Sequence, residues 1–220
     1  MSINRIFLDT AEVDEIKDAV STGLVGGIAT NPNKIAQSGK TYREVMDEIR
    51  QFFEGPIIFQ ALGRTVGEVV KHALEIHQMD PMLAVKVTAN KVGLTAIKQL
   101  VPEGVRTNAT LIFNPTQGLM AGLAGSPFIS PFVGRARMIG QNGIDTIGTI
   151  RRMFDSFCIE NTNIIGASIK DVDQVIEVIL AGAHGVAVPF PVFEAMMEHP
   201  MTTQGLERFL SEFEEIRKRS

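Results

Sequence analysis

The stretch Leu83-Ala84-Val85-Lys86-Val87 places one lysine inside an otherwise apolar run. A continuous apolar run, without polar alternation, is typical of a parallel strand that is covered on both faces. Burying an ammonium group there is so costly that the group usually loses its proton. A neutral amine is a nucleophile that attacks a ketone carbonyl and forms a Schiff base. The alternative is a structural lysine at a strand edge or one paired with a carboxylate.

Other short apolar runs share this character and alternate with helical patterns, so that the chain contains about eight strand-and-helix pairs. These runs cover residues 6–8, 27–29, 57–59, 107–110, 128–133, 164–168 and 186–188. In one domain, this repeat predicts an α/β fold in the form of a single-domain (β/α)₈ TIM barrel. The sequence has no G-x-G-x-x-G or P-loop motif, which weakens a doubly wound sheet as the alternative. We expect the barrel to span residues 1–200.

The helices between these runs have clear start signals. Thr41 with Glu44, and Thr65 with Glu68, have the spacing of a capping box. Later in the chain, one apolar stripe is expected to lie on the outside of the sheet. It consists of Val172, Val175, Ile176 and Ile179.

Composition excludes several classes of protein. The 220 residues are 45% hydrophobic and 21% charged, with a net charge of −4, which argues against a nucleic-acid or anionic-membrane surface. Cys158 is the only cysteine and the four histidines have no zinc-ligand spacing, so we expect no disulfide, no metal and no cofactor. The chain begins without a signal-peptide pattern and has no membrane-spanning run, which predicts a soluble cytoplasmic protein.

Polar residues collect where the predicted strands end, which is where a barrel of this kind carries its chemistry. They are Asp9, Thr30, Asn31, Gln60, Lys86, Asn108, Thr110 and Ser168. A single residue of this kind is often a helix cap or a turn residue, and we expect Thr10 to be a cap. Three of these residues also have a purely structural interpretation, which competes with a role in a site. Asp9 could cap a helix, Asn31 could be a turn residue before Pro32, and Gln60 could be a solvated strand end.

The order of the motifs resembles that of the transaldolase family, and the short length is similar to the small branch that includes fructose-6-phosphate aldolase. The motifs are Leu8-Asp9-Thr10, Ala29-Thr30-Asn31-Pro32, Val85-Lys86-Val87, Asn108-Ala109-Thr110-Leu111-Ile112-Phe113 with Gln117, Pro131-Phe132-Val133-Gly134-Arg135 and Gly166-Ala167-Ser168. The resemblance spans nearly the whole chain and also implies a (β/α)₈ barrel.

This resemblance implies roles for individual residues. Lys86 would be the Schiff-base nucleophile, and Asp9 the acid/base that takes the proton of the C4 hydroxyl. Thr110 and Gln60 would hold a water that takes part in proton transfer. The remaining contacts to the three-carbon unit of the substrate would come from Thr30, Asn31 and Asn108.

The resemblance also implies a site for the terminal anion of the sugar, formed by Arg135 and Ser168 with help from Lys170. A guanidinium and a hydroxyl suit a phosphate and a sulfonate almost equally, so the anion stays open. Phe132 stands at a position that resembles the phenylalanine of transaldolases, whereas Gln60 is similar to the branch that releases free dihydroxyacetone. These two markers point in opposite directions.

Three departures from the family pattern concern the rim of the site and its contacts. Thr88-Ala89-Asn90 follows Val87 where many relatives have proline, Ala29 replaces a second threonine, and Phe132 replaces the tyrosine of the free-aldol branch. We therefore expect a transaldolase that moves a dihydroxyacetone unit from an anionic six-carbon ketose to an aldehyde such as glyceraldehyde 3-phosphate. A fructose-6-phosphate-type aldolase is the alternative. A class I aldolase of the deoxyribose-phosphate type and a sugar-phosphate-binding barrel without catalysis also stay open.

The end of the chain, residues 201–220, has an amphipathic helical pattern. Its apolar stripe is Leu206, Phe209, Leu210, Phe213 and Ile216. Such a stripe must be covered, either by its own barrel or, as the small transaldolase branch implies, by a neighbouring subunit of a homo-oligomer such as a pentamer or decamer.

Overall fold

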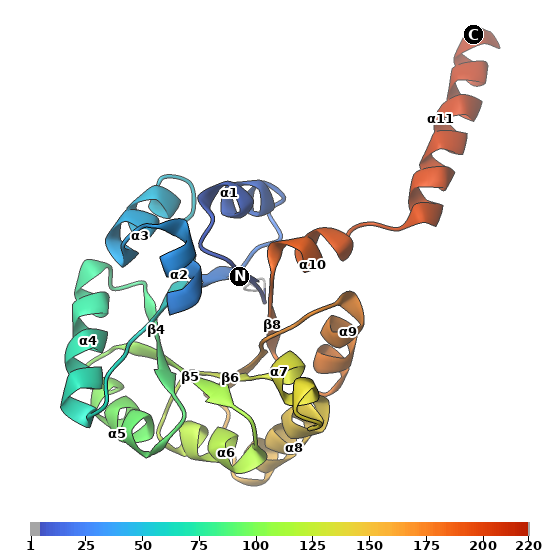
Figure 1. Cartoon of the computed structure of the whole chain (residues 1–220). Coiled ribbons are helices and arrows are strands. Elements are labelled where there is room, and N and C mark those ends of the chain that lie inside the picture. Colours follow the sequence, from blue (N-terminus) through green and yellow to red (C-terminus); the bar gives the residue numbers. More distant parts are fainter. Residues whose placement is uncertain (1–4, 220) are drawn as a thin grey trace.

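The computed structural model describes residues 5–219 and forms a closed barrel of eight parallel strands in sequence order (Figure 1). The strands are β1 (Ile6–Asp9), β2 (Gly27–Ala29), β3 (Ile57–Gln60), β4 (Ala84–Thr88), β5 (Arg106–Ile112), β6 (Phe128–Pro131), β7 (Asn163–Gly166) and β8 (Gly185–Val188). Pairing of β8 with β1 closes the barrel, with Leu8 opposite Val188. The (β/α)₈ prediction is therefore confirmed.

Helices surround the barrel, and two connections, from β2 to β3 and from β6 to β7, carry two of them. They are α1 (Val13–Ser21), α2 (Pro32–Ser38), α3 (Tyr42–Arg50), α4 (Val66–Met79), α5 (Lys91–Leu100), α6 (Pro115–Leu123), α7 (Val133–Met138), α8 (Gly143–Ser156), α9 (Val172–Leu180), α10 (Phe190–Ala195) and α11 (Pro200–Arg219). Both predicted capping boxes are present, one at the start of α3 and one at the start of α4.

The strands divide their side chains between two apolar clusters because successive residues point to opposite faces. Residues such as Leu8, Ile28 and Val85 face the helices and belong to the large core between sheet and helices. A second cluster fills the inside of the barrel. Its members are Phe7, Ala29, Ile58, Ala84, Ile165 and Ala187, with Phe128 packed against them. The inside of the barrel is thus a packed core, and a cavity lies above this layer, with Ala187 at its boundary.

Two local predictions are wrong. In α9 the buried residues are Gln174, Val175 and Val178, whereas Ile176 and Ile179 are each 51% exposed. The helix is rotated relative to the predicted stripe because Val178 and the aliphatic part of Gln174 pack inward. The N-cap of α1 is Glu12 and not Thr10, whose hydroxyl donates to Glu15 at 2.6 Å and accepts from Glu12 N at 3.2 Å.

Helix α11 extends away from the barrel beyond α10, so that its flanks do not lie along the barrel helices (Figure 1). The five residues of its predicted apolar stripe are between 55% and 68% exposed. The helix itself was predicted, and its partner in packing stays a prediction. Residues 1–4 and Ser220 lie outside the described residues. Residues 1–4 belong to the predicted barrel and to the segment in which no signal peptide was expected.

Over the residues that the structure describes, none of the helices combines the length and the apolar character that crossing a membrane requires.

Candidate active site

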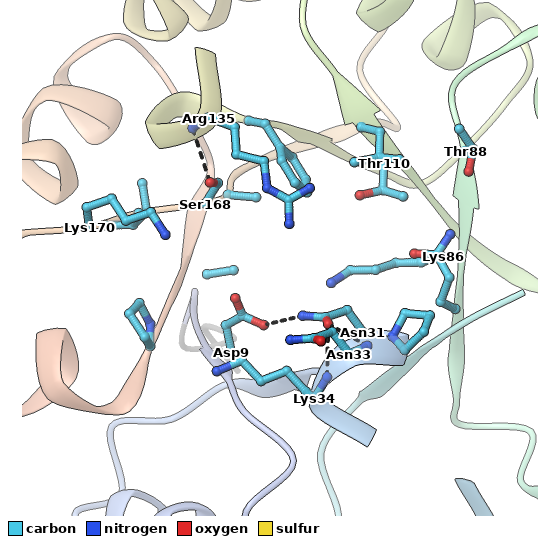
Figure 2. A pocket seen from close by; sticks show the side chains of 18 of the residues that line it. Asp9, Asn31, Asn33, Lys34, Lys86, Thr88, Thr110, Arg135, Ser168 and Lys170 are labelled. Carbon is cyan, nitrogen blue, oxygen red and sulfur yellow. Dashed lines mark hydrogen bonds between the residues drawn. The ribbon is translucent and has the colours of Figure 1, made fainter. Parts of the chain in front are cut away.

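A cavity of about 560 Å³ opens at the carboxyl end of the barrel, above the inner apolar layer. Most of the residues predicted for the site line it. They are Asp9, Asn31, Gln60, Lys86, Thr110, Phe132, Arg135, Ser168 and Lys170. Figure 2 shows that the labelled side chains, which include Asp9, Lys86 and Arg135, come from different sides of the barrel and converge on one space.

Lys86 enters the cavity from β4 and points toward the side of Asp9 (Figure 2). Its side chain is buried, and its Nζ donates a hydrogen bond of 3.0 Å to the carbonyl oxygen of Thr30. Burial lowers the pKa of the Lys86 amine, and the negative charge of Asp9 opposes this shift only in part. Since a lowered pKa increases the fraction of neutral amine, the group is better suited to nucleophilic attack than a surface lysine.

Asp9 ends β1 and faces the cavity without capping a helix, since α1 begins at Val13. Asn31 Nδ2 lies 3.5 Å from Asp9 Oδ1 and donates to it. Within residues 5–219, the Asp9 carboxylate forms no ion pair with Lys86 or with any other cation. The two groups therefore share one cavity without a salt bridge that would keep the lysine charged.

Asn31 has both a structural role and a place in the cavity. Its Oδ1 accepts hydrogen bonds of 3.1 Å from the backbone amides of Asn33 and Lys34, which caps the start of α2. The same side chain donates to Asp9 with its amide nitrogen. Capping thus fixes the orientation of the amide group, so that its donor side faces the carboxylate.

Thr110 lies near the end of β5, where the backbone departs from a regular strand. The pairing of β5 with β6 shifts in register between Ala109 and Ile112, and Leu111 has φ of 58°. A left-handed backbone at a non-glycine residue is unfavourable and persists where the surrounding structure holds it. The irregularity lies in the cavity wall, since both Thr110 and Leu111 line it.

Thr30 and Asn108 are not among the residues that line the cavity. The Thr30 side chain is fully buried, and its hydroxyl donates to Ile58 O at 2.9 Å. Asn108 is 1% exposed, and its Oδ1 accepts a hydrogen bond of 2.8 Å from the hydroxyl of Ser130. Thr30 therefore lies behind the wall and contributes its carbonyl oxygen to Lys86. Asn108 is paired with Lys86 in register and precedes Ala109 of the outer core, so its side chain faces the inside of the barrel, below the residues that line the cavity.

The opposite side of the cavity carries a second group of cationic and hydroxyl side chains. Arg135 points its guanidinium into the space, and Ser168 and Lys170 lie beside it (Figure 2). The guanidinium carbon lies 5.1 Å from the centre of the Phe132 ring, which supports it through a cation–π contact. The backbone amide of Arg135 donates to Ser168 Oγ at 3.3 Å, which leaves the hydroxyl proton free to donate to an anion.

Ser168 holds this position at a backbone cost. Its φ is 61°, and its carbonyl oxygen accepts a hydrogen bond of 3.0 Å from Gly134 N. A Cβ at Gly134 would collide with that oxygen, so only glycine permits the approach. The loop after β7 is thereby tied to the start of α7, which brings the hydroxyl and the guanidinium together.

Sequence reasoning missed several residues of the wall. The polar ones are Asn33 and Lys34, and the apolar ones include Leu62, Leu111, Ile169 and Pro189. Thr88, named above only as a departure at the rim, also lines the cavity. Thr88 carries a usable signal, since it follows Lys86 by two residues in the same strand and so shares its face. Lys34 and Leu62 belong to a helix start and a loop, whose direction no sequence period reveals.

The possible metal ligands are dispersed. In the described part of the chain, no three histidine, cysteine, aspartate or glutamate side chains lie close enough together to hold an ion.

Comparison with known proteins shows the family of the chain. The family model described as transaldolase/fructose-6-phosphate aldolase matches residues 6–219. The chain belongs to the transaldolase/fructose-6-phosphate aldolase family. It is 37% identical over 214 residues to a probable transaldolase of Dictyoglomus turgidum, and 40% identical over 214 residues to a probable transaldolase 1 of Listeria monocytogenes. Each match covers 97% of this chain and 100% of the relative.

The family assignment makes this transaldolase-family protein an enzyme of the aldolase class. A solved structure, thiamine phosphate pyrophosphorylase from Pyrococcus furiosus, is similar with a TM-score of 0.57 and 17% sequence identity. That match covers 86% of this chain and 87% of the other, and at such low identity it supports the barrel fold alone.

Proposed function

We propose that this enzyme is a transaldolase that works through a Schiff base on Lys86. The observation that carries the proposal is a buried lysine of lowered pKa that shares a cavity with Asp9 and forms no ion pair with it. The neutral amine attacks the C2 carbonyl of a ketose, and loss of water leaves an iminium ion. This ion is the electron sink that the next step needs.

Asp9 is the base of the cleavage step. It takes the proton from the C4 hydroxyl, the C3–C4 bond breaks, and its electron pair moves into the iminium to form an enamine on Lys86. The aldehyde half of the sugar leaves. Asn31 supports this role because its amide donates to the Asp9 carboxylate and holds it in place.

The transfer step reverses this chemistry with a second aldehyde. The enamine carbon attacks the new carbonyl, and Asp9 returns its proton to the alkoxide. Water then attacks the C2 iminium carbon and releases the new ketose and the free lysine. We assign Gln60 and Thr110 to hold a water for these proton transfers, because both line the cavity.

The substrates that we propose are ketoses with a phosphate or sulfonate at C6, and acceptors such as glyceraldehyde 3-phosphate. Arg135, Ser168 and Lys170 would hold the anion, and Asn31 with Asn108 and Thr30 would contact or support the three-carbon unit. Thr30 would act from behind the wall, and Asn108 from inside the barrel beside Lys86. This chemistry places the enzyme in carbohydrate metabolism, for example in the pentose phosphate pathway, and we retain a cytoplasmic location as a prediction.

Transfer is preferred over release of free dihydroxyacetone because Phe132 cannot donate a hydrogen bond to the helper water. Gln60 favours the alternative, a fructose-6-phosphate-type aldolase. Measuring free dihydroxyacetone against the product of transfer to glyceraldehyde 3-phosphate separates the two. Predominant release would reverse our order of preference.

Borohydride reduction tests the mechanism itself. With fructose 6-phosphate, sedoheptulose 7-phosphate or 6-deoxy-6-sulfofructose present, we expect a reduced dihydroxyacetone adduct on the peptide that contains Lys86. A matched sample without sugar should stay unmodified. Turnover without an adduct at Lys86 would exclude the Schiff base, and absence of both would favour the binding barrel without catalysis.

We also propose that α11 docks on a neighbouring subunit of a homo-oligomer such as a pentamer or decamer. Its apolar stripe is exposed although it includes Phe209 and Phe213, and the helix leads away from its own barrel (Figure 1). Removing residues 203–220 should lower the solution mass measured by light scattering. An unchanged mass would contradict the docking.

A further inference from the structure

The end of β3 lacks a main-chain hydrogen bond that the barrel would normally supply. On the side of β2, Ile28 N donates to Pro56 O at 2.9 Å and Thr30 N donates to Ile58 O at 3.0 Å. Because donors in a parallel ladder alternate, the next donor would be residue 32 and its acceptor Gln60 O. Residue 32 is proline, which has no N–H.

The hydroxyl of Tyr42 takes the place of this missing donor. It lies 3.0 Å from Gln60 O and donates to it from the start of α3. The ring of Tyr42 stacks on Phe59 with a centroid distance of 4.7 Å and an angle of 15°. Burial raises the pKa of the Tyr42 phenol, so that the hydroxyl keeps its proton to a higher pH than that of a free tyrosine.

His72 holds the same segment two residues later. Its ring is parallel to that of Tyr42, at 6.2 Å and 10°, and its Nδ1 lies 3.1 Å from Leu62 N. Between these two contacts, Ala61 N donates to Lys86 O at 2.9 Å. The backbone that carries Gln60 is therefore fixed from α3, from α4 and from the strand of the nucleophile.

We propose that Tyr42 is a positioning residue that acts through Gln60. The proposal rests on the function assigned above, in which Gln60 holds a water near the Schiff base. Tyr42 is not among the residues that line the cavity, so it does not touch the substrate. Without its hydroxyl, Gln60 O lacks the partner that a buried carbonyl requires, and the peptide between Gln60 and Ala61 can rotate. This rotation moves the Gln60 side chain away from the position in which it holds the water.

The Tyr42→Phe variant tests the proposal because it removes one oxygen atom and keeps the stacked ring. We expect kcat for transfer to fall about three- to tenfold, which is the usual effect of one hydrogen bond. The KM for the ketose should stay within about twofold of the wild-type value, since the anion contacts are untouched. In a Gln60→Ala background, the same substitution should have no further effect on kcat.

Thr41→Ala is the matched control. It removes the capping box at the adjacent residue and weakens the start of α3, but it leaves the Tyr42 hydroxyl in place. We expect a lower melting temperature and an unchanged kcat. A loss of kcat in Thr41→Ala as large as that in Tyr42→Phe would reduce the role of Tyr42 to helix stability and overturn the proposal.

Two further results would also overturn it. One is a wild-type kcat in Tyr42→Phe, and the other is an undiminished effect of this substitution in the Gln60→Ala background. Borohydride labelling keeps this proposal separate from the function on which it rests. An unlabelled Lys86 in the wild-type enzyme refutes the Schiff base, whereas normal labelling with either result above refutes only the role of Tyr42.

Discussion

The inside of the barrel has two layers of side chains, which are two residues apart along each strand. The lower layer is apolar and consists of Phe7, Ala29, Ile58, Ala84, Ile165 and Ala187. On each of these strands, the second residue after the apolar one lines the cavity. The upper residues are Asp9, Asn31, Gln60, Lys86, Ala167 and Pro189.

This comparison explains how one strand serves both stability and chemistry. Side chains two residues apart share a face, so each strand places an apolar group in the lower layer and then a wall residue above it. The lower layer excludes water beneath the cavity and so contributes to the lowered pKa of Lys86. Two of the three described non-glycine residues with positive φ, Leu111 and Ser168, belong to the upper level, and the third, Cys158, follows α8. Substitutions in the two layers should therefore have separate effects.

The largest expected effect is that of Lys86→Met, in the upper layer. We expect activity to fall by at least about 10⁴-fold, because no other group in the cavity can form the covalent bond. Stability should be unchanged or higher, since an apolar side chain replaces a buried amine. Transfer assays and thermal unfolding of the same preparation measure both. A clear loss of stability would contradict the division into layers.

Ile58→Ala makes the complementary change in the lower layer, two residues before Gln60. Ile58 is 2% exposed, and removing its side chain should cost about 2–5 kcal/mol of unfolding free energy. The kcat per folded molecule should stay within about threefold of the wild-type value, because the wall above keeps its side chains. Urea unfolding and active-site titration with borohydride provide the two numbers. A larger loss of kcat per folded molecule, under conditions in which all of the protein is folded, would show that the two layers are coupled.

Arg135→Ala is a smaller change at the rim of the upper layer. Loss of a charge-assisted contact should raise the KM of ketoses with a 6-phosphate or 6-sulfonate by about 10- to 100-fold. Dihydroxyacetone, which has no anion, should bind as before. Steady-state kinetics with both kinds of ligand test this. An equal loss for both would remove Arg135 from the anion site.

Much of this arrangement could be predicted from the sequence, because its signals are local and periodic. Continuous apolar runs revealed the strands, and a polar residue at the end of a run, such as Lys86 or Gln60, marked the cavity. The capping boxes of α3 and α4 were also local, since the two partners lie three residues apart. The family resemblance added the side of the cavity that carries Arg135.

Thr30 lies between Ala29 and Asn31, which both face the inside of the barrel, so the alternation of side chains already turns its hydroxyl away from the cavity and toward Ile58 O. The remaining features depend on contacts between distant segments. In α9, hydrophobicity alone did not distinguish Ile176, which is exposed, from Val178, which is buried. The hydrogen bond between Tyr42 and Gln60 also could not be predicted from the sequence, because it joins α3 to the end of β3 and replaces the N–H that Pro32 lacks.

The smallest expected effect concerns stability and pH, and it again depends on Lys86. The folded state lowers the pKa of this amine below its ordinary value of 10.5. Between the lowered value and 10.5, the unfolded chain binds the proton more than the folded one. Stability therefore rises with pH across this window, by at most about 1.4 kcal/mol per pH unit for one proton.

Below the window the amine is charged in both states, and the folded enzyme carries the full penalty of a buried ammonium. The Lys86→Met variant lacks the group, so subtracting its unfolding free energy from that of the wild type isolates the contribution of Lys86. We expect this difference to change in favour of the wild type as the pH rises toward 10.5. Urea unfolding of both proteins at a series of pH values measures it. If the difference in unfolding free energy between the two proteins did not depend on pH, the pKa of Lys86 would be the same in the folded and unfolded states. The lower layer would then have no effect on the charge of Lys86.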